Sequence, residues 1–297
     1  MKCLVTGGAG FIGSNLALVL EAEGQDVTIL DNSVYGKSAN LEGFRGKMIQ
    51  GDCCAPPALE GTFSVIFHLA AITDPRYEDN EETLDKNVEG FRQMLMLAQK
   101  TGSKLIYASS ASVYGNNPVP QKEDQKKDIL SAYARSKLMM DEMAQQCGKD
   151  MRVVGLRYFN VFGPHESHKG RPASMIFHLA NQMKAGQRPK IFKYGEQKRD
   201  HIYVRDCVRA TLLARSAPSG VYNVGTGIST SFNDLIRILN EVLGTSLQPE
   251  YIDNPYAGTY QEHTQADTSK AKKELGFVAS YSLKDAIREY LNGVGAK

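Results

Sequence analysis

The segment TGGAGFIG near the amino terminus restricts the fold of this chain more than any other part of the sequence. It joins an apolar run at residues 2–6, which predicts a strand, to a helical pattern at residues 11–23. Gly7 permits a tight turn, Gly10 lets the backbone approach a pyrophosphate, and Gly13 allows close contact between helix and sheet. The amino end of that helix also favours an anion. The segment therefore predicts a strand–turn–helix unit that binds a dinucleotide, although a glycine triplet alone would also fit an ordinary turn.

Asp31 ends the second predicted strand, residues 26–30, where its carboxylate can accept hydrogen bonds from the ribose hydroxyls of adenosine. The same charge repels a 2′-phosphate, so the sequence predicts NAD. Lys37 follows in a predicted loop and could partly neutralise such a phosphate, which leaves NADP open. Asp52 follows the next short strand, where an acid can meet the adenine amino group, but Gly51-Asp52 is also a common turn sequence.

Short β-rich runs alternate with longer helical patterns through the first half of the chain. Strands are predicted at residues 2–6, 26–30, 65–69, 105–108 and 152–156, and helices at residues 11–23, 80–100 and 131–147. Apolar strands separated by helices indicate a parallel sheet that is covered on both faces. The predicted fold class is therefore α/β, a Rossmann doubly wound parallel sheet with a smaller, interleaved C-terminal substrate lobe.

The second half of the chain is richer in proline and glycine and predicts loops and short elements. Residues 201–204, the helix after them and residues 221–224 are expected to return to the main sheet. The two domains would therefore interleave: residues 1–161 and 197–224 form the NAD(P)-binding Rossmann domain, and residues 162–196 and 225–297 form the substrate-binding lobe.

The composition excludes several classes of function. The net charge of +2 gives no reason to expect a nucleic acid or a membrane surface as partner. No apolar run approaches the roughly 18 residues of a spanning helix, and the apolar start meets glycines too soon for a secretory signal. The five cysteines are odd in number and form no CxxC pair, which predicts reduced thiols in a cytoplasmic protein and no metal site.

Tyr133 and Lys137, four residues apart in a predicted helix, should share one helix face. The ammonium of Lys137, together with a positively charged nicotinamide, is expected to lower the pKa of the Tyr133 phenol. The phenolate could then take a proton from a substrate hydroxyl while the carbon gives hydride to the cofactor. Ser110 ends the strand at residues 105–108 and could position the reacting oxygen, although a serine there is also a common cap or turn residue.

As a set, these motifs resemble the extended short-chain dehydrogenase/reductase family over about the first 160 residues. The resemblance rests on TGGAGFIG, Asp31-Asn32, the HLAA segment, Asn87, Tyr133 with Lys137, and the RYFNV segment. Most proteins of that family act on nucleotide-activated sugars, which implies a nucleotide-diphosphate sugar as partner. Carried over to this sequence, the cofactor-binding residues are Gly7, Gly10, Phe11, Ile12, Gly13, Asp31, Asn32, Lys37, Asp52, Cys53, Leu69, Ala70, Ala71, Asn87, Ser109, Tyr133, Lys137, Tyr158 and Val161.

The second half narrows the resemblance to the ADP-L-glycero-D-manno-heptose 6-epimerases. The segments GPHESHKG, KRD and GTYQ carry it. It implies an isomerase of carbohydrate metabolism that works by transient oxidation and hydride return, with Lys169 as a second proton carrier beside Tyr133, Lys137 and Ser110. The substrate-binding residues that it implies are Ser110, Asn160, Arg171, His178, Phe192, Tyr194, Arg199 and Tyr260, and a strand is expected at residues 192–195 among them. Arg199 and Arg171 could bind the diphosphate through bidentate contacts.

The sequence also departs from that pattern. Arg171 stands where those enzymes usually have a serine, and the loop at residues 71–79 is unlike theirs. A UDP-hexose 4-epimerase is therefore the main alternative, followed by a nucleotide-sugar reductase. A homo-oligomer is expected, and the helix at residues 80–100 could face a partner or only the core.

Overall fold

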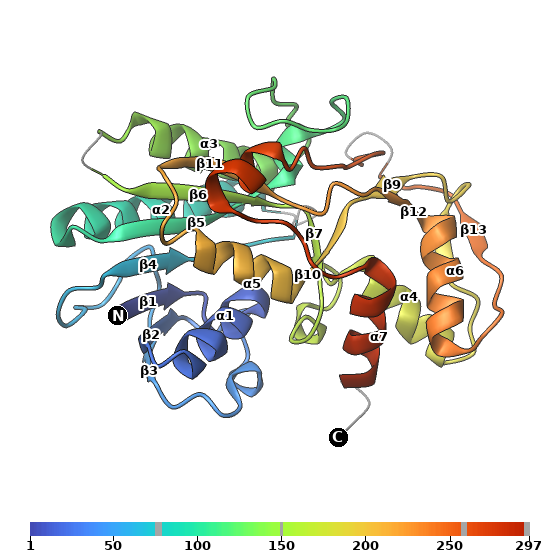
Figure 1. Ribbon diagram of the computed structural model, residues 1–297, viewed down its shortest axis with the longest axis horizontal. Coiled ribbons are helices and arrows are strands. Elements are labelled where there is room, and N and C mark those ends of the chain that lie inside the picture. The colour runs from blue at the N-terminus through green and yellow to red at the C-terminus, as the bar shows by residue number, and fades with distance from the viewer. Residues whose placement is uncertain (75–78, 149–150, 257–259, 294–297) are drawn as a thin grey trace.

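The computed structural model describes residues 1–74, 79–148, 151–256 and 260–293. At its centre lies a sheet of seven parallel strands in the order β11-β6-β5-β4-β1-β2-β3 (Figure 1). The strands are β1 (Lys2–Thr6), β2 (Asp26–Asp31), β3 (Lys47–Gln50), β4 (Val65–His68), β5 (Lys104–Ser110), β6 (Val153–Tyr158) and β11 (Gly220–Val224). The chain builds outward from β1 in one direction and then in the other, so the predicted doubly wound fold is confirmed.

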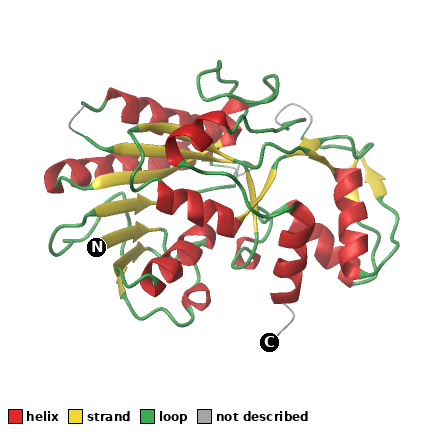
Figure 2. Cartoon of the chain, viewed as in Figure 1, coloured by secondary structure: helices red, strands yellow, loops and turns green. Residues whose placement is uncertain are grey.

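Helices cover both faces of this sheet (Figure 2). One face packs against α1 (Phe11–Ala22) and α5 (Val204–Leu213), and the other against α2 (Asn80–Thr101) and α3 (Ala132–Gln146). Successive residues of a strand point to opposite faces. In β1, Val5 accordingly joins the core under α1 while Leu4 joins the core under α2. This two-sided burial is why inner strands such as β4 and β6 are buried at every position rather than at alternate ones, whereas the edge strand β3 is largely exposed.

A smaller group of elements forms a separate core, built around Ile176, Leu235 and Ile287. Its helices are α4 (Met175–Lys184), α6 (Phe232–Leu243) and α7 (Leu283–Gly293). Its strands pair two by two: β7 (Asn160–Phe162) with β10 (His201–Tyr203), β8 (Lys190–Phe192) with β13 (Glu250–Ile252), and β9 (Lys198–Arg199) with β12 (Thr230–Ser231).

Two sequence-based expectations are wrong in this region. β10 does not return to the main sheet but pairs with β7. Just after β6, Phe159 N still donates to Val224 O of β11 at 3.0 Å, and β7 then pairs with β10 outside the main sheet. The substrate-contacting strand expected at residues 192–195 ends at Phe192, because Gly195 has a φ of +77°, outside the strand region.

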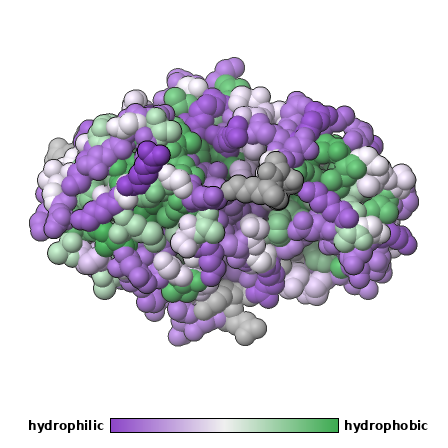
Figure 3. Space-filling model, turned by 90° about the horizontal axis from the view of Figure 1, so that it is seen from below, coloured by the Kyte–Doolittle hydropathy of each residue, from purple (hydrophilic) through white to green (hydrophobic). Residues whose placement is uncertain are grey.

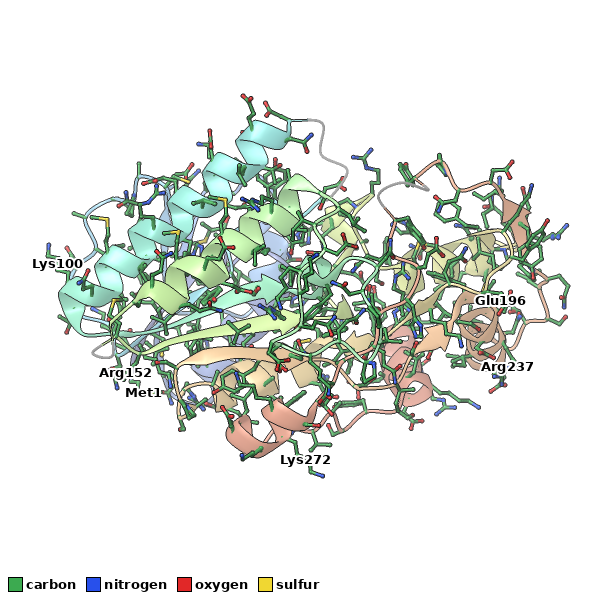
Figure 4. All side chains as sticks on the ribbon, turned by 90° about the horizontal axis from the view of Figure 1, so that it is seen from above. Met1, Lys100, Arg152, Glu196, Arg237 and Lys272 are labelled. Carbon is green, nitrogen blue, oxygen red and sulfur yellow. The ribbon has the colours of Figure 1, made fainter. Side chains whose placement is uncertain are left out.

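The strand direction places the two groups of elements relative to each other. One end of the molecule carries Met1, Lys100 and Arg152, which lie before the starts of β1, β5 and β6 (Figure 4). The opposite end carries Glu196 and Arg237. The smaller group therefore faces the carboxyl ends of the parallel strands. Figure 3 shows hydrophilic residues over most of one face, interrupted by apolar areas. No helix among the described residues has the length and apolar character needed to cross a bilayer.

Candidate active site

A cavity of about 530 Å³ opens at the carboxyl ends of the strands, within the size range of small-molecule sites. Every residue predicted to bind the dinucleotide lines this cavity, as do Ser110 and Lys169. The walls come from the glycine turn, the ends of β2, β4 and β5, the first turns of α3, and the loop after β7. Position at the carboxyl edge of a doubly wound sheet is typical of nucleotide sites.

The glycine turn has the shape that a pyrophosphate requires. Gly7 has a φ of +68°, and a Cβ there would lie 2.6 Å from Ala70 N. A Cβ on Gly13 would lie 2.1 Å from Gly7 O, so only glycine lets α1 approach the turn. At Gly10 a Cβ would meet only Gly7 O, at 3.1 Å, and this residue borders the open cavity. The residues present therefore fit the dinucleotide that the sequence predicts.

Asp31 stabilises the same turn. Its Oδ2 accepts a hydrogen bond from Ala9 N at 2.9 Å, and its Oδ1 accepts one from Ser33 N at 2.8 Å. A carboxylate has about four acceptor sites, so each oxygen keeps one for a ribose hydroxyl. Asp31 thus has a structural role in addition to the one predicted from the sequence.

The proton-transfer residues converge where β5 meets α3. Ser131 caps α3 by accepting from Ala134 N at 3.1 Å, which fixes the first turn and with it Tyr133. Lys137 Nζ lies 5.7 Å from the centre of the Tyr133 ring. Ser110 lines the cavity with Tyr133 and accepts from Ser112 N at 3.1 Å, so it is both a neighbour of the phenol and a cap.

Burial determines the protonation of this pair in the chain by itself. It raises the pKa of Tyr133, and the neighbouring Ser110 side chain opposes the rise only in part. It also lowers the pKa of Lys137 to about 8, against the attraction of Asp141. The expectation that Lys137 and a positively charged nicotinamide together lower the Tyr133 pKa stays a prediction, because in the chain by itself desolvation favours the neutral phenol.

Asn87 lines the cavity but is fully occupied by the protein. Its Oδ1 accepts from Ile72 N at 2.8 Å, and its Nδ2 donates to Ile72 O and to Ser136 Oγ, both at 3.0 Å. These bonds fix the segment after β4 against α2 and α3. The rest of that loop, residues 75–78, lies outside the described residues, as do residues 257–259, which include the start of the GTYQ match.

Lys169 reaches the cavity on a loop that Glu166 organises. Glu166 is buried; its carboxylate accepts from Gly163 N, from Ser174 N and from the Ser174 hydroxyl at 3.0, 2.6 and 3.0 Å. Lys169 Nζ lies 5.5 Å from the centre of the Phe11 ring, and burial lowers the pKa of its ammonium. The sequence analysis missed Glu166, for which the only signal was its place in the GPHESHKG segment.

The same loop is anchored to the glycine-turn side of the cavity. His165 Nδ1 is 2.9 Å from Ser14 Oγ on α1, and His168 Nδ1 is 3.0 Å from Asn40 Nδ2. Asn40 in turn donates to Ala9 O at 2.9 Å. The two histidines therefore connect the Lys169 loop to the turn that surrounds the dinucleotide site.

Of the residues predicted to bind substrate, only Ser110 lines this cavity. Arg199 and Tyr260 lie together in the smaller group of elements, with the guanidinium 4.7 Å from the ring centre, and Phe192 stacks edge-on against Tyr260 at 5.3 Å. Arg199 is only 7% exposed, and none of its hydrogen bonds among the described residues goes to a carboxylate. Such a cation is suited to an anionic ligand.

The other predicted substrate residues are not gathered there. Asn160 donates to Thr264 Oγ1 at 2.8 Å, and His178 Nε2 lies 3.2 Å from Arg171 O. Arg171 itself forms an ion pair with Asp74 in the cavity wall. Tyr194 is 69% exposed.

A larger hollow of about 940 Å³ lies at the amino ends of the strands, beside Met1, Lys104 and Arg152. Its cations are already engaged in structural bonds. Lys104 Nζ donates to Arg215 O at 3.0 Å and to Ala217 O at 2.6 Å, and Arg152 donates to Gly102 O. It contains none of the predicted catalytic residues, so we assign the chemistry to the smaller cavity.

Comparison with known proteins agrees with this geometry. The NAD dependent epimerase/dehydratase family model matches residues 3–225. A protein of Brachyspira hyodysenteriae named ADP-L-glycero-D-manno-heptose-6-epimerase is 39% identical over 287 residues, covering 91% of this chain and 90% of that protein. The crystal structure of the Helicobacter pylori enzyme of that name has a TM-score of 0.92 at 37% identity, covering 100% of this chain and 96% of the other.

A second enzyme type has nearly the same fold. The UDP-glucose 4-epimerase of Thermotoga maritima, solved with UDP-glucose, has a TM-score of 0.89 at 29% identity over 99% of each chain. The fold therefore does not distinguish the two activities, whereas the sequence identity is higher to the heptose enzymes.

Proposed function

Because the chain belongs to the NAD-dependent epimerase/dehydratase family, we propose that it is a nucleotide-sugar epimerase, specifically an ADP-glycero-manno-heptose 6-epimerase. The observation that carries this proposal is the meeting of Tyr133, Lys137 and Ser110 with Lys169, from a separate loop, in one cavity that fits a dinucleotide. When bound, NAD supplies an acceptor and then a donor of hydride at the sugar carbon.

In this proposal the chain's own residues move and hold protons. Tyr133 takes the proton of the substrate hydroxyl, and Ser110, which lines the cavity beside the phenol, holds the reacting oxygen. Once the cofactor is bound, the positive charges of Lys137 and of the nicotinamide act together to favour the phenolate form of Tyr133. Burial of the site excludes water, which preserves the ketone until hydride returns.

Lys169 completes the proposal as the second acid/base. When hydride returns to the opposite face of the ketone, the new hydroxyl points away from Tyr133. A second residue is therefore needed to give this oxygen its proton. Burial lowers the pKa of Lys169, which makes its ammonium a better proton donor to the returning oxygen. Glu166 fixes the loop and keeps Lys169 at the cavity.

The smaller group of elements is proposed to bind the nucleotide diphosphate. Arg199, buried and without a carboxylate partner among the described residues, supports this role, together with Tyr260 and Phe192. We also propose a division into residues 1–161 with 197–224 and residues 162–196 with 225–297, except that strands β7, β9 and β10 at these bounds belong to the smaller group of elements. A homo-oligomer and a cytoplasmic location are proposed as well, the latter because all five cysteines are free thiols.

The test is incubation of the purified protein with ADP-heptose, UDP-glucose or UDP-glucuronate in heavy water, with the product stereochemistry determined by NMR. Inversion at C6 of the heptose, with the carbon-bound hydrogen retained, is the expected result. Inversion of a UDP-hexose at C4, without action on ADP-heptose, would favour the 4-epimerase. Net formation of NADH, or solvent deuterium on the carbon, would rule out internal hydride return.

A further inference from the structure

The dinucleotide cavity contains a second group of reactive side chains just after β3. One ligand atom each from Asp52, Cys53 and Cys54 lie within 4.8 Å of one another. Two thiols and a carboxylate are ligands that zinc-class cations accept, with a fourth position left for water. We propose that these three residues form a binding site for a single thiophilic divalent cation such as Zn²⁺ or Cd²⁺.

The loop conformation brings the three side chains together. Neighbouring residues of an extended strand point in opposite directions. After β3, however, Cys54 N donates to Asp52 Oδ1 at 2.8 Å, which folds the carboxylate back over the next residues. Cys54 Sγ donates to Lys86 O of α2 at 3.2 Å, which holds this thiol near the helix. The sequence analysis predicted no metal site, because adjacent cysteines lack the spacing of known zinc motifs.

The thiols lie against α2. A Cβ on Gly90 of α2 would lie 2.7 Å from Cys53 Sγ and 3.7 Å from Cys54 Sγ, so a glycine at this position lets the Cys53 thiol pack close to the helix. The same point lies 3.7 Å from His68 Cε1. Both thiols therefore lie at the α2 wall of the cavity, close to His68.

His68 provides an independent indication of a ligand. Its Nδ1 is 2.8 Å from Thr6 Oγ1, but its Nε2 is buried and has no hydrogen-bond partner among the described residues. Burial lowers the pKa of His68 to about 3, so the ring is neutral. An unused buried ring nitrogen is the kind of group that an ion or its bound water satisfies.

Cation binding at this site conserves atoms and charge without any change of oxidation state. The two thiols lose their protons to solvent, two metal–sulfur bonds and one metal–oxygen bond form, and no electron changes hands. Asp52 is 3.5 Å from the exposed Lys86 ammonium, which can move into solvent. All three ligand residues are partly exposed, so the cation can enter from the cavity.

The site overlaps the position assigned to the adenine end of the dinucleotide, a point that rests on the proposed function. Asp52 and Cys53 line the cavity with the other predicted cofactor residues. A cation bound there would occupy their side chains and change the loop, so cation and NAD should compete.

The test is a titration of the reduced, metal-free and NAD-free full-length protein with Cd²⁺. Thiolate-to-cadmium absorption should rise to one Cd²⁺ per chain, with release of about two protons, as required by two thiol ligands. Cys53→Ser and Cys54→Ser should each weaken binding roughly tenfold or more. The matched control is Cys147→Ser, because this half-buried thiol bonds to Met143 O and should leave binding unchanged.

Three outcomes would overturn the cation site. They are a cadmium absorption that does not reach one Cd²⁺ per chain, a loss of Cd²⁺ affinity in Cys147→Ser equal to that in the Cys53 and Cys54 variants, or an unchanged Cd²⁺ affinity in both Cys53→Ser and Cys54→Ser. Wild-type protein gives a readout that does not depend on variant folding, since Cd²⁺ should protect Cys53 and Cys54 from alkylation as read by mass spectrometry. Saturating NAD should weaken Cd²⁺ binding. If saturating NAD leaves the Cd²⁺ affinity unchanged, the overlap with the adenine position is refuted but the cation site itself is not. Cd²⁺ binding does not depend on epimerase activity, so failure of the proposed function can be recognised separately.

Discussion

Arg171 donates two hydrogen bonds to one oxygen of Asp74, from Nε at 3.0 Å and from Nη2 at 2.8 Å. Arg171 lies two residues after Lys169, while Asp74 lies in the cavity wall after β4. The ion pair therefore connects the loop that carries the proposed second acid/base to the loop that follows β4. It also gives Arg171 a partner within the protein, where the sequence suggested a substrate diphosphate.

Arg171→Met is expected to lower the free energy of unfolding only modestly. The Arg171 side chain is 53% exposed, so solvent screens the pair and its contribution should be about 0.2–1 kcal/mol. A double-mutant cycle with Asp74→Asn, read as free energies of unfolding in denaturant titrations, measures this coupling. A hundredfold rise in the KM for the sugar nucleotide would instead restore the diphosphate contact that the sequence suggested.

Tyr133→Phe should reduce kcat by about 10²–10⁴-fold, because it removes the proton acceptor and leaves the ring packing intact. NAD affinity should change little, as measured by a binding titration. Tyr251→Phe is the matched control, because that hydroxyl is remote from the cavity and donates to Asn233 Oδ1. Near-normal turnover in Tyr133→Phe would remove the assigned role.

Lys169→Met should block epimerisation while transient oxidation of the substrate survives. The signal is nicotinamide absorbance that appears on mixing with sugar nucleotide, without inverted product in the NMR spectrum. Lys184→Met, at the exposed end of α4, controls for loss of a lysine from the same region. Wild-type epimerisation in Lys169→Met would contradict the two-base scheme.

Lys137→Met should stabilise the fold below pH 8 although it impairs catalysis. Burial lowers the folded-state pKa of Lys137 to about 8, whereas the unfolded value is about 10.4. The protonated amine therefore destabilises the folded state by on the order of 3 kcal/mol. Between about pH 8 and pH 10.4 the unfolded state binds more protons than the folded state. The destabilisation caused by Lys137 therefore falls as the pH rises.

Denaturant unfolding of wild type and Lys137→Met at pH 7 and pH 10 measures this effect. The advantage of the variant should be largest at pH 7 and mostly gone at pH 10. Arg135→Met, an exposed position on the same helix, should show no such pH dependence. An advantage that grows with pH would show that the Lys137 pKa is not depressed.

Gly13→Ala should lower the free energy of unfolding by about 1–3 kcal/mol and weaken NAD binding. Its Cβ would lie 2.1 Å from Gly7 O, so α1 must move away from the turn. Gly148→Ala is the control, because nothing lies within 4 Å of an added Cβ there, and it should change stability by less than about 0.5 kcal/mol. Equal effects would mean that the close approach at Gly13 is not required.

The sequence predicted the main sheet well because its signals are local. Apolar runs bounded by glycine and acid residues mark β1 and β2, and a Ser131 cap before an amphipathic run marks α3. The β7–β10 pair was mispredicted because pairing depends on where the chain leaves the sheet at Phe159, which no local pattern records.

The candidate site divides in the same way. The chain order by itself determined a dinucleotide turn, an acid at the end of β2, and a tyrosine–lysine pair on one helix face, because each depends on residues close in sequence. Only the tertiary structure decided the partner of Arg171, the role of Glu166, and the pKa values of Tyr133 and Lys137. These depend on burial and on contacts between distant segments, and desolvation and long-range pairing exist only once the chain is folded.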